Sequence, residues 1–145
     1  MQDYEKLEVW KLAHRIAVNV QRVTARIARR DNSGLSSERR RASLSVPANI
    51  AEGSCKESNR EFARFLQIAA GSAAELHYHV RFATDTALIP RPAGETLLAE
   101  TTRMRKMLFL LLRRVREATP SSGHTRTTQD PRPEARHREP LTDDN

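Results

Sequence analysis

One long helical pattern begins in the stretch Glu61-Phe62-Ala63-Arg64-Phe65-Leu66-Gln67-Ile68-Ala69-Ala70-Gly71-Ser72-Ala73-Ala74-Glu75-Leu76 and continues to about Thr86. Its apolar residues recur at the steps of three and four that place side chains on one helical face. They are Phe62, Phe65, Leu66, Ala69, Ala73, Leu76, Val80 and Ala83. Just before them, Ser58-Asn59-Arg60-Glu61 has the spacing of a capping box, which predicts that the helix begins near Ser58.

Two further segments show the same period, one from about Tyr4 or Leu7 to Ala28 and one from about Ala93 to Ala118. In the first, the apolar positions are Val9, Ala13, Ile16, Val20, Val23 and Ile27. In the second, they are Leu97, Leu98, Thr101, Met104, Leu108, Leu111 and Val115. No strand-like alternation occurs anywhere in the chain. The sequence therefore predicts an all-α protein, an antiparallel up-down-up-down four-helix bundle with short connections.

The remaining helix of this bundle is predicted between Ser36 or Ser37 and Gly53. Either serine can accept a hydrogen bond from the exposed amides of the first turn. Gly53 suits the left-handed residue that commonly follows the last turn. The run Gly71-Ser72-Ala73-Ala74 in the neighbouring helix carries small side chains, which favours a close approach between the two helices.

This second helix has two apolar groups. Plotted at about 100° per residue, Ala42, Val46 and Ile50 lie on the side that a bundle core requires. Leu44, Ala48 and Ala51 lie on a different side. A polar ladder runs between the two groups and consists of Arg41, Ser45, Asn49 and Glu52. Because a peripheral helix needs only one apolar face, this pattern indicates a helix that is covered on both sides.

The ladder has two interpretations. Its members either satisfy one another and specify helix register, or they form a catalytic or ligand-binding cluster with Glu52 as an acid or base. The first is favoured, because the chain offers no nucleophile with an adjacent base, no facing carboxylates and no phosphate-binding glycine loop. A subunit contact is compatible with it, and the predicted contact residues are Arg41, Ser45, Ala48, Asn49 and Glu52.

Charge and composition divide the chain in two. The segment 119–145 has only two apolar side chains apart from proline, so we expect a disordered tail after a bundle that spans 1–118. The net charge of the chain is +7. The tail has four arginines and five acidic residues, a net −1, so the bundle carries +8. The basic excess therefore belongs to the folded part, where it bears on partners.

The sequence also limits location and chemistry. The single cysteine, Cys55, indicates a reducing compartment and is expected to be a buried or half-buried inert thiol. We expect neither a signal peptide nor a membrane span, and hence a cytoplasmic protein. His77 and His79 point about 200° apart on a helix and cannot share a metal ion, and Glu75 with His79 makes a poor site. No catalytic residue, metal, cofactor or small-molecule substrate is therefore predicted.

Several motifs resemble a known family. They are Leu7-x-Val9-Trp10, Gly34-Leu35, Arg40-Arg41-Ala42, Ser45-Val46-Pro47-Ala48-Asn49-Ile50-Ala51-Glu52-Gly53, and Glu61-Phe62-x-x-Phe65-Leu66-x-Ile68-Ala69-x-Gly71-Ser72-x-x-Glu75-Leu76. The chain from about residue 4 to 118 is similar to the bacterial four-helix-bundle proteins of the rRNA-intervening-sequence family. The resemblance implies a homopentamer without enzyme activity and a connection with RNA. A related bundle accompanies reverse transcriptases of diversity-generating retroelements and binds nucleic acid.

Two non-enzymatic functions remain open. The first is an assembly that binds rRNA or another structured nucleic acid through basic helix faces. The candidate residues are Arg15, Arg22, Arg26, Arg29, Arg39, Arg40, Arg103, Lys106, Arg113 and Arg114. Aromatic residues make up only 5% of the chain, so binding is expected mainly at phosphates. The alternative is a protein-protein scaffold with no nucleic-acid role, in which the same charge provides solubility.

Overall fold

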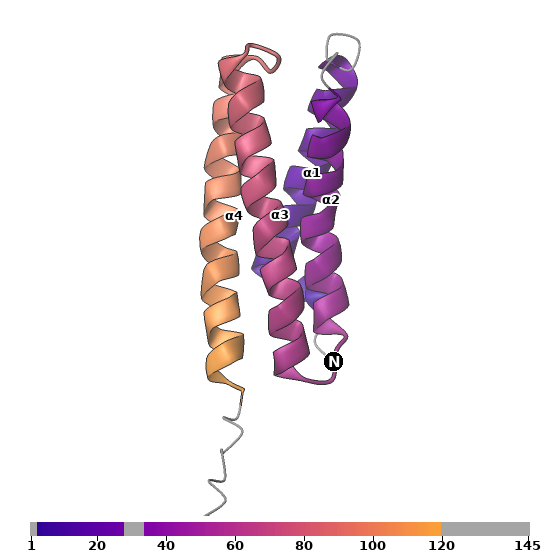
Figure 1. The fold of residues 1–145 in the computed structure, drawn as a ribbon, viewed down its shortest axis with the longest axis vertical. Helices are drawn as coiled ribbons and strands as arrows, with labels where there is room; N and C mark the ends of the chain where they lie inside the picture. Colours follow the sequence, from indigo (N-terminus) through magenta and orange to yellow (C-terminus); the bar gives the residue numbers. More distant parts are fainter. Residues whose placement is uncertain (1–2, 28–33, 120–145) are drawn as a thin grey trace, which may run out of the picture.

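The structure, a computed structural model, describes residues 3–27 and 34–119. Within these ranges a short 3-10 helix, η1 (Tyr4–Lys6), precedes four α-helices (Figure 1). These are α1 (Glu8–Ile27), α2 (Leu35–Ser54), α3 (Asn59–Asp85) and α4 (Arg91–Glu117). The described ranges contain no strand. The predicted all-α four-helix bundle is confirmed, while the predicted tail from residue 120 onward lies outside the described residues.

The four helices pack in a closed ring. Each one contacts its neighbour along the chain, α1 contacts α4, and neither diagonal pair meets. The α1–α4 pair therefore lies on the opposite side of the bundle from the α2–α3 pair (Figure 1). Of the four contacts, the one between α1 and α4 is the least extensive.

The core follows the predicted helical faces. All eight apolar positions predicted for α3 are buried. The core face of α2, with Ala42, Val46 and Ile50, is buried as well. On α1 and α4, Val23 and Leu111 are only half-buried, and the other predicted apolar positions are buried. Periodicity alone thus located most of the core, although it omitted Leu12, Ala17, Ala63 and Ile89.

The ends of the helices agree with the sequence where caps are local. Ser58 caps α3, and its Oγ accepts a hydrogen bond from the Glu61 amide at 3.2 Å. Helix α4 begins at Arg91, two residues earlier than predicted, with Pro92 in its first turn. Proline is tolerated there because the first amides of a helix have no intrahelical partner.

The predicted ends of α2 were wrong. The helix begins at Leu35 after Gly34, whose φ of 72° lies in the left-handed region. Gly53 is a buried residue inside the helix, which continues through Ser54 to a cap at Cys55. A Cβ on Gly53 would lie 2.7 Å from Cβ of Phe65 and 2.8 Å from Cδ2 of Phe62. The glycine is needed for the close packing of α2 on α3.

The expectation of a buried or half-buried thiol was also wrong, because Cys55 is exposed. It follows Ala51 by four residues and so continues the outward side of α2 past the last turn.

Candidate functional site

The polar ladder of α2 lies along the seam between α2 and α3. The hydroxyls of Ser45 and Ser72 are hydrogen-bonded at 2.8 Å, which joins the two helices near their middle. The side-chain amide of Asn49 donates through Nδ2 to the carbonyl oxygen of Ser45 at 2.7 Å and to the Ser45 hydroxyl at 3.1 Å. Small side chains at Ser45 and Ser72 therefore permit the close approach that the sequence predicts for this pair of helices.

The ends of the ladder are charged and paired. Arg41 binds the carboxylate of Glu38 and lies 3.9 Å from that of Glu75 on α3. The hydrogen bond and charge of Glu38 raise the pKa of Arg41. Glu52 pairs with Lys56 at 3.5 Å, within α2 and its cap. The ladder residues thus bond to one another and to near neighbours, as expected of a register-setting seam.

An apolar surface flanks this seam. We call it the α2–α3 face and define it by exposed or half-buried residues that recur at helical spacing: Leu44, Ala48, Ala51 and Cys55 on α2, and Ile68, Gly71, Tyr78 and Phe82 on α3. Leu44 is 52% exposed and Tyr78 is 64% exposed. The apolar residues of α2 are also less concentrated on one side of the helix than those of α1, α3 or α4. In this single chain its second apolar group is therefore left uncovered.

The positive charge lies on the other side of the bundle. Helix α4 has seven basic and three acidic residues, and α1 has four basic residues and one acidic residue. Helix α3 has three of each, and α2 has three basic and two acidic residues. One of the three basic residues on α2, Arg39, is fully buried. The outward charge of the α2–α3 pair is therefore close to zero.

We define the α1–α4 face by the exposed basic residues that the sequence proposed on these two helices: Arg15, Arg22, Arg26, Arg103, Lys106, Arg113 and Arg114. Two of them are paired, Arg15 with Glu100 at 3.3 Å and Arg113 with Glu117 at 3.0 Å. The other five have no salt-bridge partner among the described residues. The charge of Arg103 on α4 also lowers the pKa of Glu8 on α1, as a smaller contribution beside the hydrogen bond and charge of Lys11.

Two of the proposed basic residues, Arg39 and Arg40, lie on α2 and not on this face. Arg39 is 0% exposed, and Arg39 Nη2 donates a hydrogen bond to Ser36 Oγ at 3.1 Å. Its proposed contact with nucleic acid was therefore wrong. The signal was in the sequence, since Arg39 precedes Val46 by seven residues and so shares the core side of α2. Arg40 is half-buried on α2, and Arg29 lies outside the described residues.

One feature of α4 was not predicted from the sequence. Phe109 is 64% exposed and borders a shallow hollow of about 530 Å³ with Thr102, Arg105, Lys106 and Leu110. The spacing of Arg105 and Phe109, four residues apart, places both on one side of the helix. That spacing could have revealed an aromatic ring among basic side chains.

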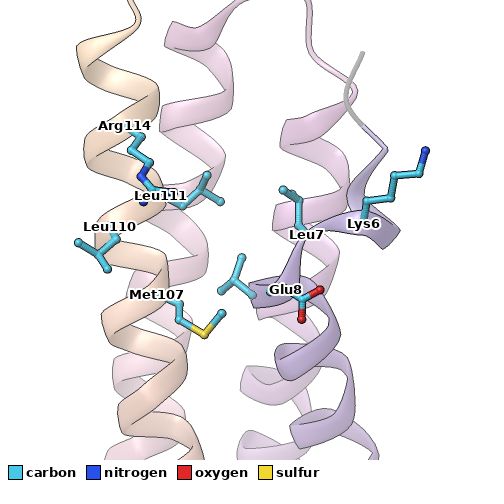
Figure 2. Close-up of a pocket in the computed structure, with 8 residues that line it drawn as sticks. Lys6, Leu7, Glu8, Met107, Leu110, Leu111 and Arg114 are labelled. Atoms are coloured by element: carbon cyan, nitrogen blue, oxygen red, sulfur yellow. The ribbon is translucent and has the colours of Figure 1, made fainter.

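A second groove lies between the start of α1 and the end of α4. Figure 2 shows Leu7 and Glu8 on one side and Met107, Leu110 and Leu111 on the other. Its volume is about 370 Å³, and its basic lining residues are Lys6 and Arg114. Since Leu110 borders both this groove and the hollow at Phe109, the two depressions adjoin each other.

Among the described residues, His14 and His77 contact neighbouring side chains. His14 stacks on Trp10 with a separation of 5.1 Å between the ring centroids. His77 Nδ1 lies 2.8 Å from Thr101 Oγ1, and that hydroxyl donates its proton to the carbonyl of Leu98. When the hydroxyl donates in this way, His77 donates from Nδ1 and Nε2 is the nitrogen that titrates. Among the described residues, no group of three His, Cys, Asp or Glu side chains could hold a metal ion.

Burial lowers the pKa of His77, and the charges of Arg105 and Arg81 lower it further. The folded protein then binds this proton more weakly than the unfolded chain. The stability from neutral His77 is present above the unfolded pKa of about 6.5 and is lost as the pH falls below it. We expect the free energy of unfolding to fall more between about pH 7.5 and 5.5 in the wild type than in His77→Gln. The free energies come from urea unfolding at each pH. An equal fall in the two proteins across that range would contradict this assignment.

None of the helices in the described ranges combines the length and hydropathy of a bilayer span.

Comparison with known proteins places these surfaces in context. The model of a family described as 23S rRNA-intervening sequence protein matches residues 5–109. The fold is similar to a crystal structure of a protein of unknown function from the S23 ribosomal protein family of Bacteroides thetaiotaomicron VPI-5482. The TM-score is 0.67 and the identity 24%, with coverage of 72% of this chain and 97% of that chain. No curated protein matches this chain.

Proposed function

The chain belongs to the family of 23S rRNA-intervening sequence proteins, and from this premise we propose that it is a non-catalytic assembly protein that binds structured RNA. Copies join through the α2–α3 face, and the α1–α4 face binds phosphates. The homopentamer is proposed from the family resemblance described above. A cytoplasmic location in a bacterium is part of the same proposal.

One observation carries the proposal: most of the exposed apolar surface and most of the positive charge lie on opposite sides of one small bundle, and Phe109 and Leu110 on α4 are the exceptions. The α2–α3 face is nearly neutral, and its exposed large side chains include Leu44, Ile68 and Tyr78. Exposed apolar surface of this kind is typical of protein contacts. The α1–α4 face offers arginines without acidic partners, and guanidinium groups suit phosphate oxygens. A chain that only needed solubility has no physical reason to separate the two kinds of surface.

The test of RNA binding is a titration with a structured rRNA fragment at about 50 and 200 mM salt. We expect tight binding at low salt and a steep loss at high salt, because phosphate contacts release counterions. The triple variant Arg22→Gln, Arg26→Gln and Arg103→Gln should lower the magnitude of the salt slope by about 2–3, since each contact contributes about 0.7–0.9.

The matched control is a triple variant on α3, Arg60→Gln, Arg64→Gln and Arg81→Gln. It removes the same charge from the other side of the bundle, so we expect a nearly unchanged slope. An equal loss in both variants would contradict the assignment of the α1–α4 face. No binding by the wild type at low salt would end the RNA proposal. Protein partners that survive RNase during purification would then favour the scaffold function.

A further inference from the structure

Phe109 is the exposed aromatic residue that the proposed phosphate surface leaves unexplained. It lies on the outer side of α4 and is 64% exposed. Arg105 and Lys106 precede it by one helical turn, and Arg113 follows it by one turn. The hollow of about 530 Å³ beside the ring is bordered by Arg105, Lys106, Thr102 and Leu110. An apolar ring is thus flanked along the helix by cations in both directions.

The cations around this ring are available to a ligand. Arg105 and Lys106 have no salt-bridge partner among the described residues. Arg113 pairs with Glu117, but both side chains are more than 60% exposed. Exposed pairs of this kind contribute little to stability, so a phosphate group can replace the carboxylate. The hollow therefore fits a ligand that has a flat apolar part between negative groups.

We propose that Phe109 stacks on an unpaired nucleobase, whose flanking phosphates bind Arg105, Lys106 and Arg113. The inference rests on the proposed RNA binding and adds which RNA is preferred. A base inside a duplex already stacks on its neighbours and offers no free face, whereas a base in a loop or single strand does. The protein should therefore prefer RNA that contains unpaired nucleotides over a duplex of the same length.

An anionic membrane surface is the competing occupant, since Phe109 and Leu110 are apolar and their surroundings are basic. Helices that lie on membranes bury a broad apolar face along their length. Within the described part of α4, large exposed apolar side chains are confined to the adjacent pair Phe109 and Leu110. Single-ring stacking needs no broader surface, so the geometry favours a nucleobase.

The experiment compares Phe109→Leu, Phe109→Trp and the wild type on two probes, a single-stranded oligoribonucleotide that contains 2-aminopurine and an RNA duplex of equal length. Leucine keeps an apolar side chain but has no aromatic face. Stacking on one base is worth about 1–3 kcal/mol, so Phe109→Leu should weaken single-strand binding roughly 5- to 150-fold. Duplex affinity and the salt slope should not change. The wild type and Phe109→Trp should alter 2-aminopurine fluorescence on binding, and Phe109→Leu should not.

The matched control is Leu110→Ala, because Leu110 is the neighbouring exposed apolar residue on α4, at 50% exposed, but has no aromatic face. It should leave the ratio of single-strand to duplex affinity unchanged. If the wild type binds RNA and Phe109→Leu keeps that ratio, the stacking inference is overturned while the proposed RNA binding stands. If the wild type binds neither probe, both fail. Binding to phosphatidylglycerol vesicles that depends on Phe109, without an effect on RNA, would assign the patch to membranes and overturn the inference.

Discussion

Ala48→Glu is expected to convert the assembled protein into folded monomers. Ala48 is exposed on the α2–α3 face, between Leu44 and Ala51 along the outer side of α2. In an assembly that covers this face, the new carboxylate would lose its water without gaining a basic partner. Burying an unpaired charge costs several kcal/mol, and the cost recurs in every copy. The monomer itself should be unaffected, because glutamate is a good helix former at an exposed position.

Light scattering over a range of protein concentrations gives the mass of each variant. The matched control is Ala99→Glu, the same change at an exposed position of α4. We expect Ala99→Glu to remain assembled. A wild type with the mass of a monomer would remove the argument for self-assembly. An Ala48→Glu variant that stays fully assembled would place the contact on another surface of the bundle.

Gly94→Ala is expected to reduce the free energy of unfolding by about 2–3 kcal/mol. Gly94 is buried where α4 begins, against the end of α3. A Cβ there would lie 2.9 Å from Cβ of Thr84, 2.7 Å from its Cγ2, and closer still to its Oγ1. Rotation of the threonine cannot relieve the clash with its own Cβ. It would also break the 2.7 Å bond that Oγ1 donates to the carbonyl of Val80. The two helices would have to separate.

Gly71→Ala is the control, because a Cβ at Gly71 would meet no atom within 4 Å. There the substitution should stabilise the protein by about 0.5–1 kcal/mol through helix propensity. Both variants are best measured by urea unfolding in the Ala48→Glu background, so that any effect on assembly does not enter. Changes of the same sign in the two variants would contradict the packing described for α3 and α4.

The periodicity of α3 and the position of Gly53 show what could and could not be predicted from the sequence. Helix period depends on residues close together in the chain, and it located α3 with eight of its nine buried apolar positions. The role of Gly53 could not be found in that way. A glycine near the end of a helical pattern predicts a left-handed cap, whereas Gly53 is there because Phe62 and Phe65 of another helix lie against it. Such a contact depends on the distance between helices, which no local pattern contains.

The candidate surfaces were predictable to different degrees. The second apolar group of α2 was evident from spacing, as was much of the basic charge of α1 and α4. Arg39 was misassigned because residue type was given more weight than its position on the core side of the helix. Phe109 was overlooked because a low aromatic content says nothing about where the few aromatic side chains lie. The opposition of the two faces follows only from the closed ring of helices, which composition and period do not determine.

That opposition has a consequence for avidity. Copies that join through the α2–α3 face must all present the α1–α4 face away from the contact. A long RNA would then meet several equivalent sites on one particle, and each contact after the first would be intramolecular. Linked sites of this kind bind more tightly than any single site without a new contact in the monomer. Affinity would accordingly depend on the length of the RNA, and one chain alone would bind only weakly.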